Sequence, residues 1–239
     1  MNMENWLQLR KITILEELTE DQIQAIAPKF GERTYKKRNQ LMHEGERQDG
    51  IYFILKGKVK LTKMNPDGQE KVVAVVSEGE IIGEIVAFDG GACPYTAETM
   101  EEVRAAFLTI KDFKEMLNNY SPVAMACLQQ SALRLRKAYR HMKNLALLDT
   151  YGRMAAHLFK MTRDYGVQEK EGIRINFNVT RQEMAQFIGT SRETVSRVLA
   201  EFERMGILQV DRHQITVLDI EELRERASGG RKNSSSNEW

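Results

Sequence analysis

Four polar side chains lie close together in the chain, at a spacing that suits hydrogen bonding to the edges of nucleic-acid bases. They are Arg192, Glu193, Ser196 and Arg197. On a helix these positions share the outward face of the first two turns. Arginine can donate two hydrogen bonds to guanine, glutamate can accept one from the cytosine amino group, and serine is permissive. The alternative interpretation is that they are solvated charges on an ordinary amphipathic helix.

The stretch from Thr180 to Met205 predicts two consecutive helices that would position these side chains. Thr180 and Glu183 form a capping box at the start of the first helix. Gly189 ends that helix, and Ser191 caps the second. Each helix has one apolar face at three- and four-residue spacing. The apolar positions are Met184, Ala185, Phe187 and Ile188, then Val195, Val198, Leu199 and Phe202. The pattern indicates a helix-turn-helix, whose second helix commonly enters the DNA major groove.

The composition excludes several classes of protein. The chain has 239 residues, 42% hydrophobic and 29% charged, which is typical of a soluble globular protein with room for two modest domains. No apolar run approaches the roughly 18 residues of a membrane span and no signal peptide is evident, so we expect no membrane partner. The two cysteines are too few for a disulfide framework or a metal-ligand set. We therefore expect the protein to reside in a reducing compartment, the cytoplasm. Because the net charge is only +1, any DNA affinity must come from local arrangement.

The first half of the chain changes from a helical to a strand-like pattern. Residues 1 to about 30 have helical periodicity. From Glu32 to about Ile110, short alternating or apolar runs are separated by glycine-containing turns, such as Lys56-Gly57-Lys58 and Asp67-Gly68. Strands at such regular intervals predict an antiparallel sandwich or roll. The expected fold class is therefore α+β, with an N-terminal roll over residues 1–120.

A long helix is predicted from Ser121-Pro122 to Leu148, after a short one from Lys111 to Asn118. Its apolar and small residues repeat every seven positions, which suits a parallel two-helix partner. The predicted interface consists of Leu128, Ser131, Leu135, Ala138, Met142 and Leu145. The alternative is that this seam packs on the sheet of its own chain. We expect a homodimer, with residues 121–148 as the dimerisation helix.

The C-terminal region is expected to form a winged helix over residues 149–227. A break at Asp149-Thr150 precedes an amphipathic helix from Tyr151 to about Asp164. A strand follows at Ile173, Ile175 and Phe177, before the helix pair. Two apolar runs flank the turn Asp211-Arg212-His213, which is typical of a hairpin. The tail from Ser228 to Trp239 is rich in serine and glycine, so residues 228–239 should be disordered.

Taken in order, these segments resemble the cyclic-AMP receptor protein / fumarate-nitrate regulator (CRP/FNR) family of bacterial transcription factors. The resemblance covers nearly the whole chain. The segments that carry it are Gly45, Gly57, Asp67-Gly68, Gly79-Glu80-Ile81-Ile82-Gly83-Glu84, Asn144 to Asp149, Thr180 to Glu183 and Ser191 to Arg197. The resemblance implies a roll like a cyclic-nucleotide-binding domain, a dimerisation helix and a C-terminal winged helix-turn-helix.

The resemblance also implies how the chain would bind double-stranded DNA. A parallel dimer of this kind places its recognition helices about 34–36 Å apart on a near-palindromic operator. Arg192, Glu193 and Arg197 would read base edges, with Ser196 beside them, on a half-site expected to contain TGA. The expected phosphate contacts are Thr180, Arg181, Gln182, Thr190, Ser191 and His213. RNA polymerase is the partner expected from the family.

The residues that would contact the effector depart from the pattern of the cyclic-AMP-binding members of the family. Gly83 and Glu84 would meet a ribose, but Pro94-Tyr95 replaces the arginine-serine pair that would neutralise the cyclic phosphate. No lysine or arginine occurs from Val72 to Val103. A buried phosphate without a counter-charge is strongly disfavoured, which argues against cyclic AMP unless Arg134 or Arg136 reaches in. The expected effector pocket consists of Gly83, Glu84, Cys93, Tyr95, Arg134, Ala138 and Tyr139.

Other ligands and other functions remain open from the sequence. Two cysteines cannot supply the four thiolates of an iron–sulfur cluster. Two weaker alternatives are haem bound through His43, His141 or His157 and a redox role for Cys93. The remaining possibilities are an unidentified small-molecule effector or no ligand. No nucleophile–base motif, metal cluster or phosphate-binding loop suggests an enzyme. The competing function is a cyclic-nucleotide sensor that docks a protein partner instead of DNA.

Overall fold

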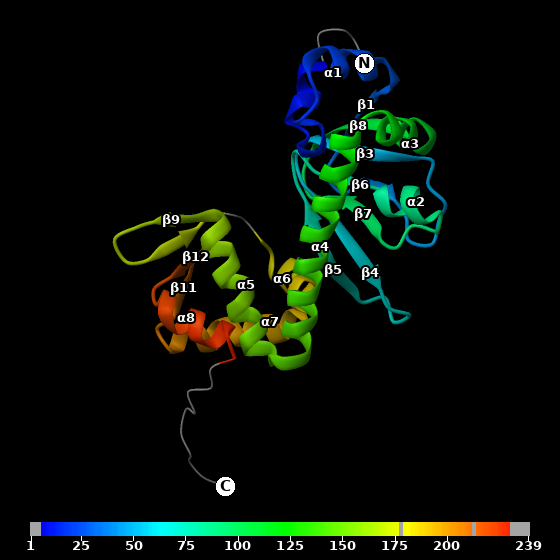
Figure 1. The fold of residues 1–239 in the computed structure, drawn as a ribbon. Coiled ribbons are helices and arrows are strands. Elements are labelled where there is room, and N and C mark those ends of the chain that lie inside the picture. The colour runs from blue at the N-terminus through cyan, green and yellow to red at the C-terminus, as the bar shows by residue number, and fades with distance from the viewer. Residues whose placement is uncertain (1–5, 177–178, 212–213, 230–239) are drawn as a thin grey trace. The chain divides into compact units, whose positions relative to one another are not determined.

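The structure is a computed structural model that describes residues 6–176, 179–211 and 214–229. The chain divides into two compact units, residues 1–136 and 137–239 (Figure 1). The first unit combines helices with two antiparallel sheets, and the second combines helices with a third sheet. The predicted α+β class is therefore confirmed.

The N-terminal segment is helical, as predicted, but mostly in short 3₁₀ turns. These are η1 (Trp6–Lys11), η2 (Thr13–Leu15) and η3 (Ala27–Lys29), with one α-helix, α1 (Glu20–Ile26). Thr19 caps α1 in a capping box with Gln22. Buried residues such as Leu9, Ile12 and Leu15 anchor these turns on the roll.

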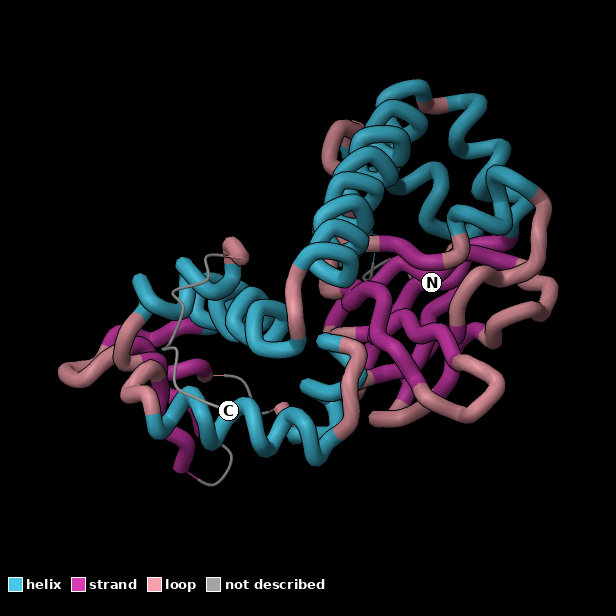
Figure 2. Tube along the Cα trace, turned by 90° about the horizontal axis from the view of Figure 1, so that it is seen from below, coloured by secondary structure: helices cyan, strands magenta, loops and turns pink. Residues whose placement is uncertain are grey.

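Two four-stranded sheets form the roll, with strand orders β1-β8-β3-β6 and β2-β7-β4-β5. The strands are β1 (Gly31–Tyr35), β2 (Gln40–Met42), β3 (Gly50–Lys56), β4 (Val59–Met64), β5 (Glu70–Val76), β6 (Ile81–Ile82), β7 (Thr96–Thr99) and β8 (Val103–Thr109). One core cluster lies between the sheets and includes Ile54, Leu61 and Ala105. A second cluster includes Phe53 and residues of the helical segments that precede and follow the sheets, so β3 is buried on both faces. Figure 2 shows the strands of the roll in magenta and the helices in cyan.

A short helix within the roll, α2 (Glu84–Asp89), was not predicted from the sequence. It begins after Gly83, whose φ is +96°, and ends at Gly90, whose φ is +70°. Both angles lie in the left-handed region that favours glycine, so the two glycines set the limits of the helix. Its first residue, Glu84, is buried.

Two helices follow the roll: α3 (Ile110–Asn119) and the long α4 (Ser121–Leu147). The predicted limits of α4 are thus confirmed to within one residue. Within the first unit α4 buries Val123 and Cys127, which belong to the same core cluster as Phe53 and Phe113. Because 123 and 127 are one turn apart, a single face of the helix packs on the roll.

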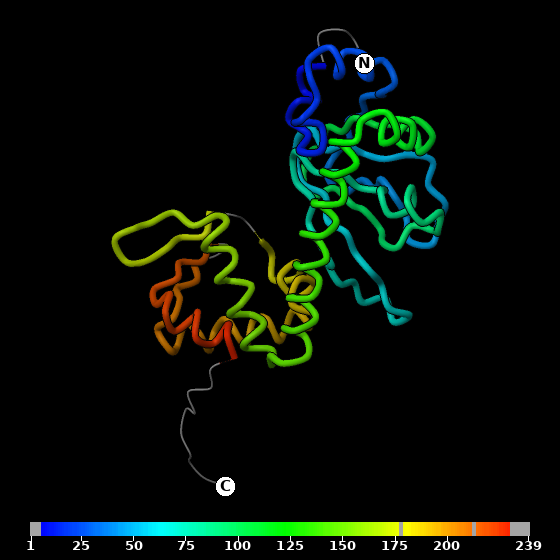
Figure 3. Tube along the Cα trace, in the orientation of Figure 1, coloured from blue at the N-terminus to red at the C-terminus, as the bar shows by residue number. Residues whose placement is uncertain are grey.

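The second unit is a winged helix-turn-helix, as expected (Figure 3). Its helices are α5 (Thr150–Tyr165), α6 (Arg181–Ile188), α7 (Arg192–Arg204) and α8 (Ile220–Ala227). Its strands are β9 (Gly166–Gln168), β10 (Ile173–Ile175), β11 (Leu208–Asp211) and β12 (Gln214–Val217), in the order β11-β12-β10-β9. Strand β9 and helix α8 were not predicted.

Some sequence predictions fall outside the described residues. Phe177, Arg212, His213 and residues 230–239 of the predicted tail are among them. Ser228 is described, and it ends α8 by donating its hydroxyl to the Arg224 carbonyl at 2.9 Å. No helix in the described part of the chain is long and apolar enough to cross a membrane.

Candidate DNA-binding and effector sites

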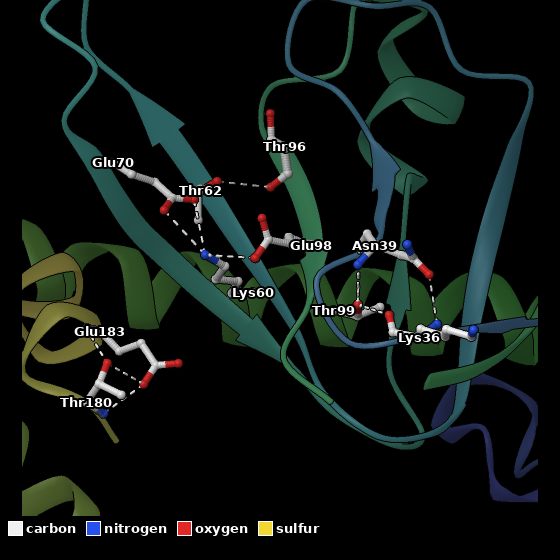
Figure 4. Close-up of polar contacts among 10 residues, drawn as sticks. All are labelled: Lys36, Asn39, Lys60, Thr62, Glu70, Thr96, Glu98, Thr99, Thr180 and Glu183. Atoms are coloured by element: carbon white, nitrogen blue, oxygen red, sulfur yellow. Dashed lines mark hydrogen bonds and ion pairs between the residues drawn. The ribbon is translucent and has the colours of Figure 1, made fainter. Parts of the chain in front are cut away.

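The caps of the helix pair are formed as the sequence predicted. The Thr180 hydroxyl accepts a hydrogen bond from the Glu183 amide at 3.1 Å, and the Glu183 carboxylate accepts one from the Thr180 amide at 2.7 Å (Figure 4). Gly189 ends α6 with φ of +73°. The Ser191 hydroxyl accepts from the Thr194 amide at 3.2 Å and caps α7. The turn between the helices is therefore determined by local chemistry.

Helix α7 has one buried and one exposed face. Val195, Val198, Leu199 and Phe202 are buried in the core of the second unit. On the opposite face, Arg192, Glu193 and Arg197 are exposed. Ser196 is half-buried and donates its hydroxyl to the Arg192 carbonyl at 3.1 Å. Within the described residues Arg197 forms no ion pair, so its guanidinium is available to an external acceptor.

Glu193 remains a hydrogen-bond acceptor in this arrangement. Its own backbone amide, the Ser191 side chain and the charge of Arg192 lower the pKa of its carboxyl group. The carboxylate is therefore ionised at neutral pH, in the form that accepts from a cytosine amino group.

The predicted phosphate contacts differ in how freely they can reach an anion. Arg181 and Gln182 are exposed in the first turn of α6, at its positive dipole end. The hydroxyls of Thr180 and Ser191 already serve as caps. Thr190 is half-buried, and His213 lies outside the described residues.

One arginine that the sequence analysis did not select holds the start of this unit together. Arg153 on α5 donates from Nε to the Ile188 carbonyl at 2.9 Å and from Nη1 to the Leu148 carbonyl at 3.0 Å. Its Nη2 donates to the Thr150 hydroxyl at 3.3 Å. The guanidinium thus ties the end of α6 to the residue that follows α4.

The heptad residues of α4 are largely exposed. Leu128 is 62% exposed, Leu135 52%, Met142 53% and Leu145 44%. Ala138 is also exposed, and Ser131 is half-buried. Within the first unit, Leu128 and Leu135 therefore do not belong to the core that α4 forms with the roll. The helix contributes the face of Val123 and Cys127 to that core.

Several residues of the expected effector pocket contact one another. The Gly83 amide donates to the Tyr95 hydroxyl at 3.2 Å, and Tyr95 is only 5% exposed. Arg134 of α4 reaches Glu84 and forms an ion pair with its carboxylate. Arg134 also donates to the Ile81 carbonyl. Of the two arginines that the sequence offered, Arg134 enters the pocket, whereas Arg136 is exposed.

Both cysteines are buried thiols. Burial, with added effects of nearby carboxylates, raises the pKa of Cys93, whose thiol donates to the Tyr95 carbonyl at 3.0 Å. Burial raises the pKa of Cys127 to about 12. Because the thiolate is the reactive form, neither environment favours a redox thiol.

The remaining candidate effector residues are exposed or half-buried. Ala138 and Tyr139 are exposed, about one turn beyond Arg134 on α4. His43 is exposed in the first unit, and His157 stacks on Phe187 in the second, with ring centroids 4.9 Å apart. No group of three or more potential metal-ligating side chains occurs within the ranges that the structure describes.

Comparison with known proteins identifies both halves of the chain. A family model described as a cyclic nucleotide-binding domain matches residues 32–120, and one described as a Crp-like helix-turn-helix domain matches residues 152–226. The CRP-like cAMP-activated global transcriptional regulator of Mycobacterium tuberculosis is 32% identical over 184 residues, which cover 77% of this chain and 82% of the relative. The chain belongs to the CRP/FNR family. It is therefore a transcription regulator with a helix-turn-helix DNA-binding domain, in a family that does not consist of enzymes.

Two solved structures of CRP/FNR-like architecture show the same fold. The c-di-GMP-responsive regulator CLP of Xanthomonas campestris has a TM-score of 0.75 at 22% identity, over 83% of this chain and 99% of that one. A CooA mutant from Carboxydothermus hydrogenoformans has a TM-score of 0.76 at 20% identity, over 92% and 99%. At these identities the similarity supports the fold alone.

The matched family models include the helix pair and part of the expected effector pocket of this CRP/FNR protein. Helices α6 and α7 lie within residues 152–226, and the pocket residues Gly83, Glu84 and Tyr95 lie within 32–120. Arg153 is the polar contact that shapes the helix pair from outside the predicted motifs, whereas Arg134 was among the predicted pocket residues. In the sequence, Arg153 is an arginine on an amphipathic helix, which is usually solvated.

Proposed function

We propose that this protein regulates transcription as a homodimer on a near-palindromic operator. The observation that carries the proposal is the exposed heptad seam of α4, since Leu128, Leu135 and Met142 are each more than half exposed. An apolar stripe of this length is costly in water and suits a second copy of the same helix. The functional parts would be an effector-sensing roll at 1–120, a dimerisation helix at 121–148 and a DNA-binding domain at 149–227.

The exposed face of α7 supplies the proposed base contacts. The residues proposed to read base edges are Arg192, Glu193, Ser196 and Arg197. The residues proposed to position the helix by contacting phosphates are Arg181, Gln182, Thr180, Thr190, Ser191 and His213. A face this rich in charge does not suit the alternative role of docking a protein partner, whose contact surface should be more apolar. RNA polymerase is the further partner proposed by analogy with the family.

We propose that the roll does not respond to cyclic AMP, although the Mycobacterium tuberculosis relative is described as cAMP-activated. No basic residue occurs from Val72 to Val103, and Arg134 is already paired with Glu84. A cyclic phosphate would have to be buried without a counter-charge or displace that ion pair.

Two measurements test the proposed function. Selection from a random duplex pool should enrich an inverted repeat, and enrichment of no shared motif would refute sequence-specific binding. Isothermal titration with cyclic AMP should give no saturable heat. Saturable binding in the micromolar range would show that the missing-cation argument is wrong while leaving DNA binding intact.

A further inference from the structure

Arg153, near the start of α5, donates hydrogen bonds to three groups of the second unit. Its Nε donates to the Ile188 carbonyl at 2.9 Å, its Nη1 to the Leu148 carbonyl at 3.0 Å and its Nη2 to the Thr150 hydroxyl at 3.3 Å. Arg153 is half-buried, and in the part of the chain that the structure describes it forms no ion pair with a carboxylate. Its charge is therefore directed at backbone carbonyls, in hydrogen bonds that are stronger than those of a neutral donor.

The Ile188 carbonyl is one of the groups that a helix end leaves without a partner. Ile188 is the last residue of α6, and the last four carbonyls of an α-helix have no donor within the helix. The amides of Gly189 and Thr190 both donate to the Ala185 carbonyl, at 2.9 and 3.1 Å. Because these two amides turn back to Ala185, Arg153 supplies a donor for Ile188 from another helix. A cation at this position also suits the negative dipole end of α6.

The anchored carbonyl lies directly before the turn that leads into the recognition helix. Only residues 189–191 separate Ile188 from Arg192, the first residue of α7. Ile188 and Val195 belong to the core cluster that also contains Ala155 of α5. Apolar burial is non-directional, whereas a hydrogen bond weakens steeply when its angle changes. The bonds of Arg153 therefore restrict the direction of this turn relative to α5 more closely than the apolar core alone.

The start of α5 in turn fixes the position of Arg153. The Asp149 carboxylate accepts from the Gly152 amide at 2.8 Å and caps the helix, and the Asp149 carbonyl accepts from the Arg153 amide at 2.9 Å. Gly152 is buried, and a Cβ at this position would lie 3.2 Å from the Leu148 Cβ and 3.3 Å from the Arg226 carbonyl. Because the backbone is this closely packed, the guanidinium starts from a fixed point and connects two parts of one rigid arrangement.

We propose that Arg153 is a positioning residue for DNA reading: through the Ile188 carbonyl it fixes the turn from which α7 starts, and thereby the direction of the base-reading side chains of α7. This inference rests on the proposed function, because it concerns how the same helix pair meets the operator. It assigns Arg153 no DNA contact of its own. Loss of the guanidinium should therefore weaken discrimination between sequences in a protein that still folds and still binds DNA through phosphate contacts.

The test changes the geometry of the cation and keeps its charge. Arg153→Lys replaces the planar guanidinium by a compact ammonium group, which cannot serve the same three acceptors at their separate positions. Arg163→Lys is the matched control, since Arg163 is an exposed arginine of the same helix, paired with Asp164 at 3.0 Å. Affinity is measured by fluorescence anisotropy on the selected operator and on random duplex of equal length. Thermal unfolding and sedimentation equilibrium report the fold and the oligomeric state of each protein.

We expect Arg163→Lys to match the wild type within about threefold on both duplexes, as is usual for a surface substitution. Arg153→Lys should remain folded and dimeric, and it should bind the operator at least about tenfold more weakly, because base contacts are lost in both half-sites. Its affinity for random duplex should stay within about threefold of the wild-type value, because phosphate contacts supply non-specific binding. A purely structural role would lower the unfolding temperature but leave the operator-to-random affinity ratio of the folded protein unchanged.

The outcomes separate this proposal from the function on which it rests. A folded Arg153→Lys protein with the wild-type affinity ratio would overturn the positioning role, although sequence-specific binding would then stand. Equal losses on operator and random duplex would also overturn it, because they are expected of an arginine that contacts phosphate itself. A wild type that selects no shared motif would refute the proposed function, and this inference with it.

If Arg153→Lys does not fold, the wild type itself provides the test. Its arginine side chains are isotopically labelled, and exchange of the Arg153 Nε proton with water is followed by NMR. The proton should exchange slowly both in the free protein and on the operator, because the bond to the Ile188 carbonyl protects it in both states. Rapid exchange in either state would overturn the proposal.

Discussion

Replacing Arg197 with alanine should remove discrimination between DNA sequences while leaving the fold intact. Arg197 is exposed on α7 and has no ion-pair partner among the described residues, so we expect the free energy of unfolding to change by less than about 0.5 kcal/mol. A bidentate contact to a base contributes about 1–3 kcal/mol of discrimination. Two recognition helices in a dimer double this to about 2–6 kcal/mol, or roughly 30-fold to 10⁴-fold in operator affinity.

The assay compares the selected operator with random duplex of equal length, over a range of salt concentrations. If Arg197 reads a base, affinity for the operator falls, whereas affinity for random duplex and its salt dependence change little. Arg204→Ala is the matched control, because Arg204 is an exposed arginine at the end of the same helix, paired with Glu201 at 2.6 Å. Equal losses on operator and random DNA would show that Arg197 contacts phosphate and would refute base reading.

Three further predictions address the caps, the seam and the thiols. Thr180→Ala should lower the free energy of unfolding by about 1 kcal/mol, because it removes the capping box of α6, and Thr180→Ser should restore it; equal thermal stability of all three proteins would contradict this. Leu135→Glu should give a folded monomer by sedimentation equilibrium, whereas Leu133→Glu, which is 59% exposed but outside the heptad seam, should remain dimeric; a dimeric Leu135→Glu protein would place the interface elsewhere. Since burial raises the pKa of Cys127 to about 12, this thiol stabilises the fold below the unfolded pKa of about 8.5, and the contribution is lost as pH rises from there toward 12. Urea titrations at pH 8 and 10 should show this loss in the wild type and a smaller one in Cys127→Ala, and parallel losses in the two proteins would contradict it.

The helix-turn-helix could be predicted residue by residue because its determinants are local. A capping box, a left-handed glycine and a serine cap act within three or four positions of the backbone they organise. Thr180, Gly189 and Ser191 therefore have the roles in the structure that their types and spacing indicated. The heptad of α4 is also a local pattern, and the exposure of Leu128 and Leu135 favours the dimer interpretation, which remains a prediction.

The elements that were missed depend on contacts between distant residues. Helix α2 is six residues long and has no polar cap, and its limits come from Gly83 and Gly90. The pairing of Arg134 with Glu84 joins positions fifty residues apart, and periodicity alone could not separate Arg134 from Arg136. The N-terminal turns have helical periodicity, but packing on the roll divides them into short 3₁₀ segments.

The central claim is that two copies, joined along α4, present their α7 helices to successive major grooves. It is tested most directly by footprinting the purified protein on its selected operator while measuring the mass of the complex in solution. We predict two chains per duplex and an inverted repeat whose half-site centres are about 10–10.5 base pairs apart. One chain per duplex, or protection of a single half-site with no symmetric partner, would contradict the claim.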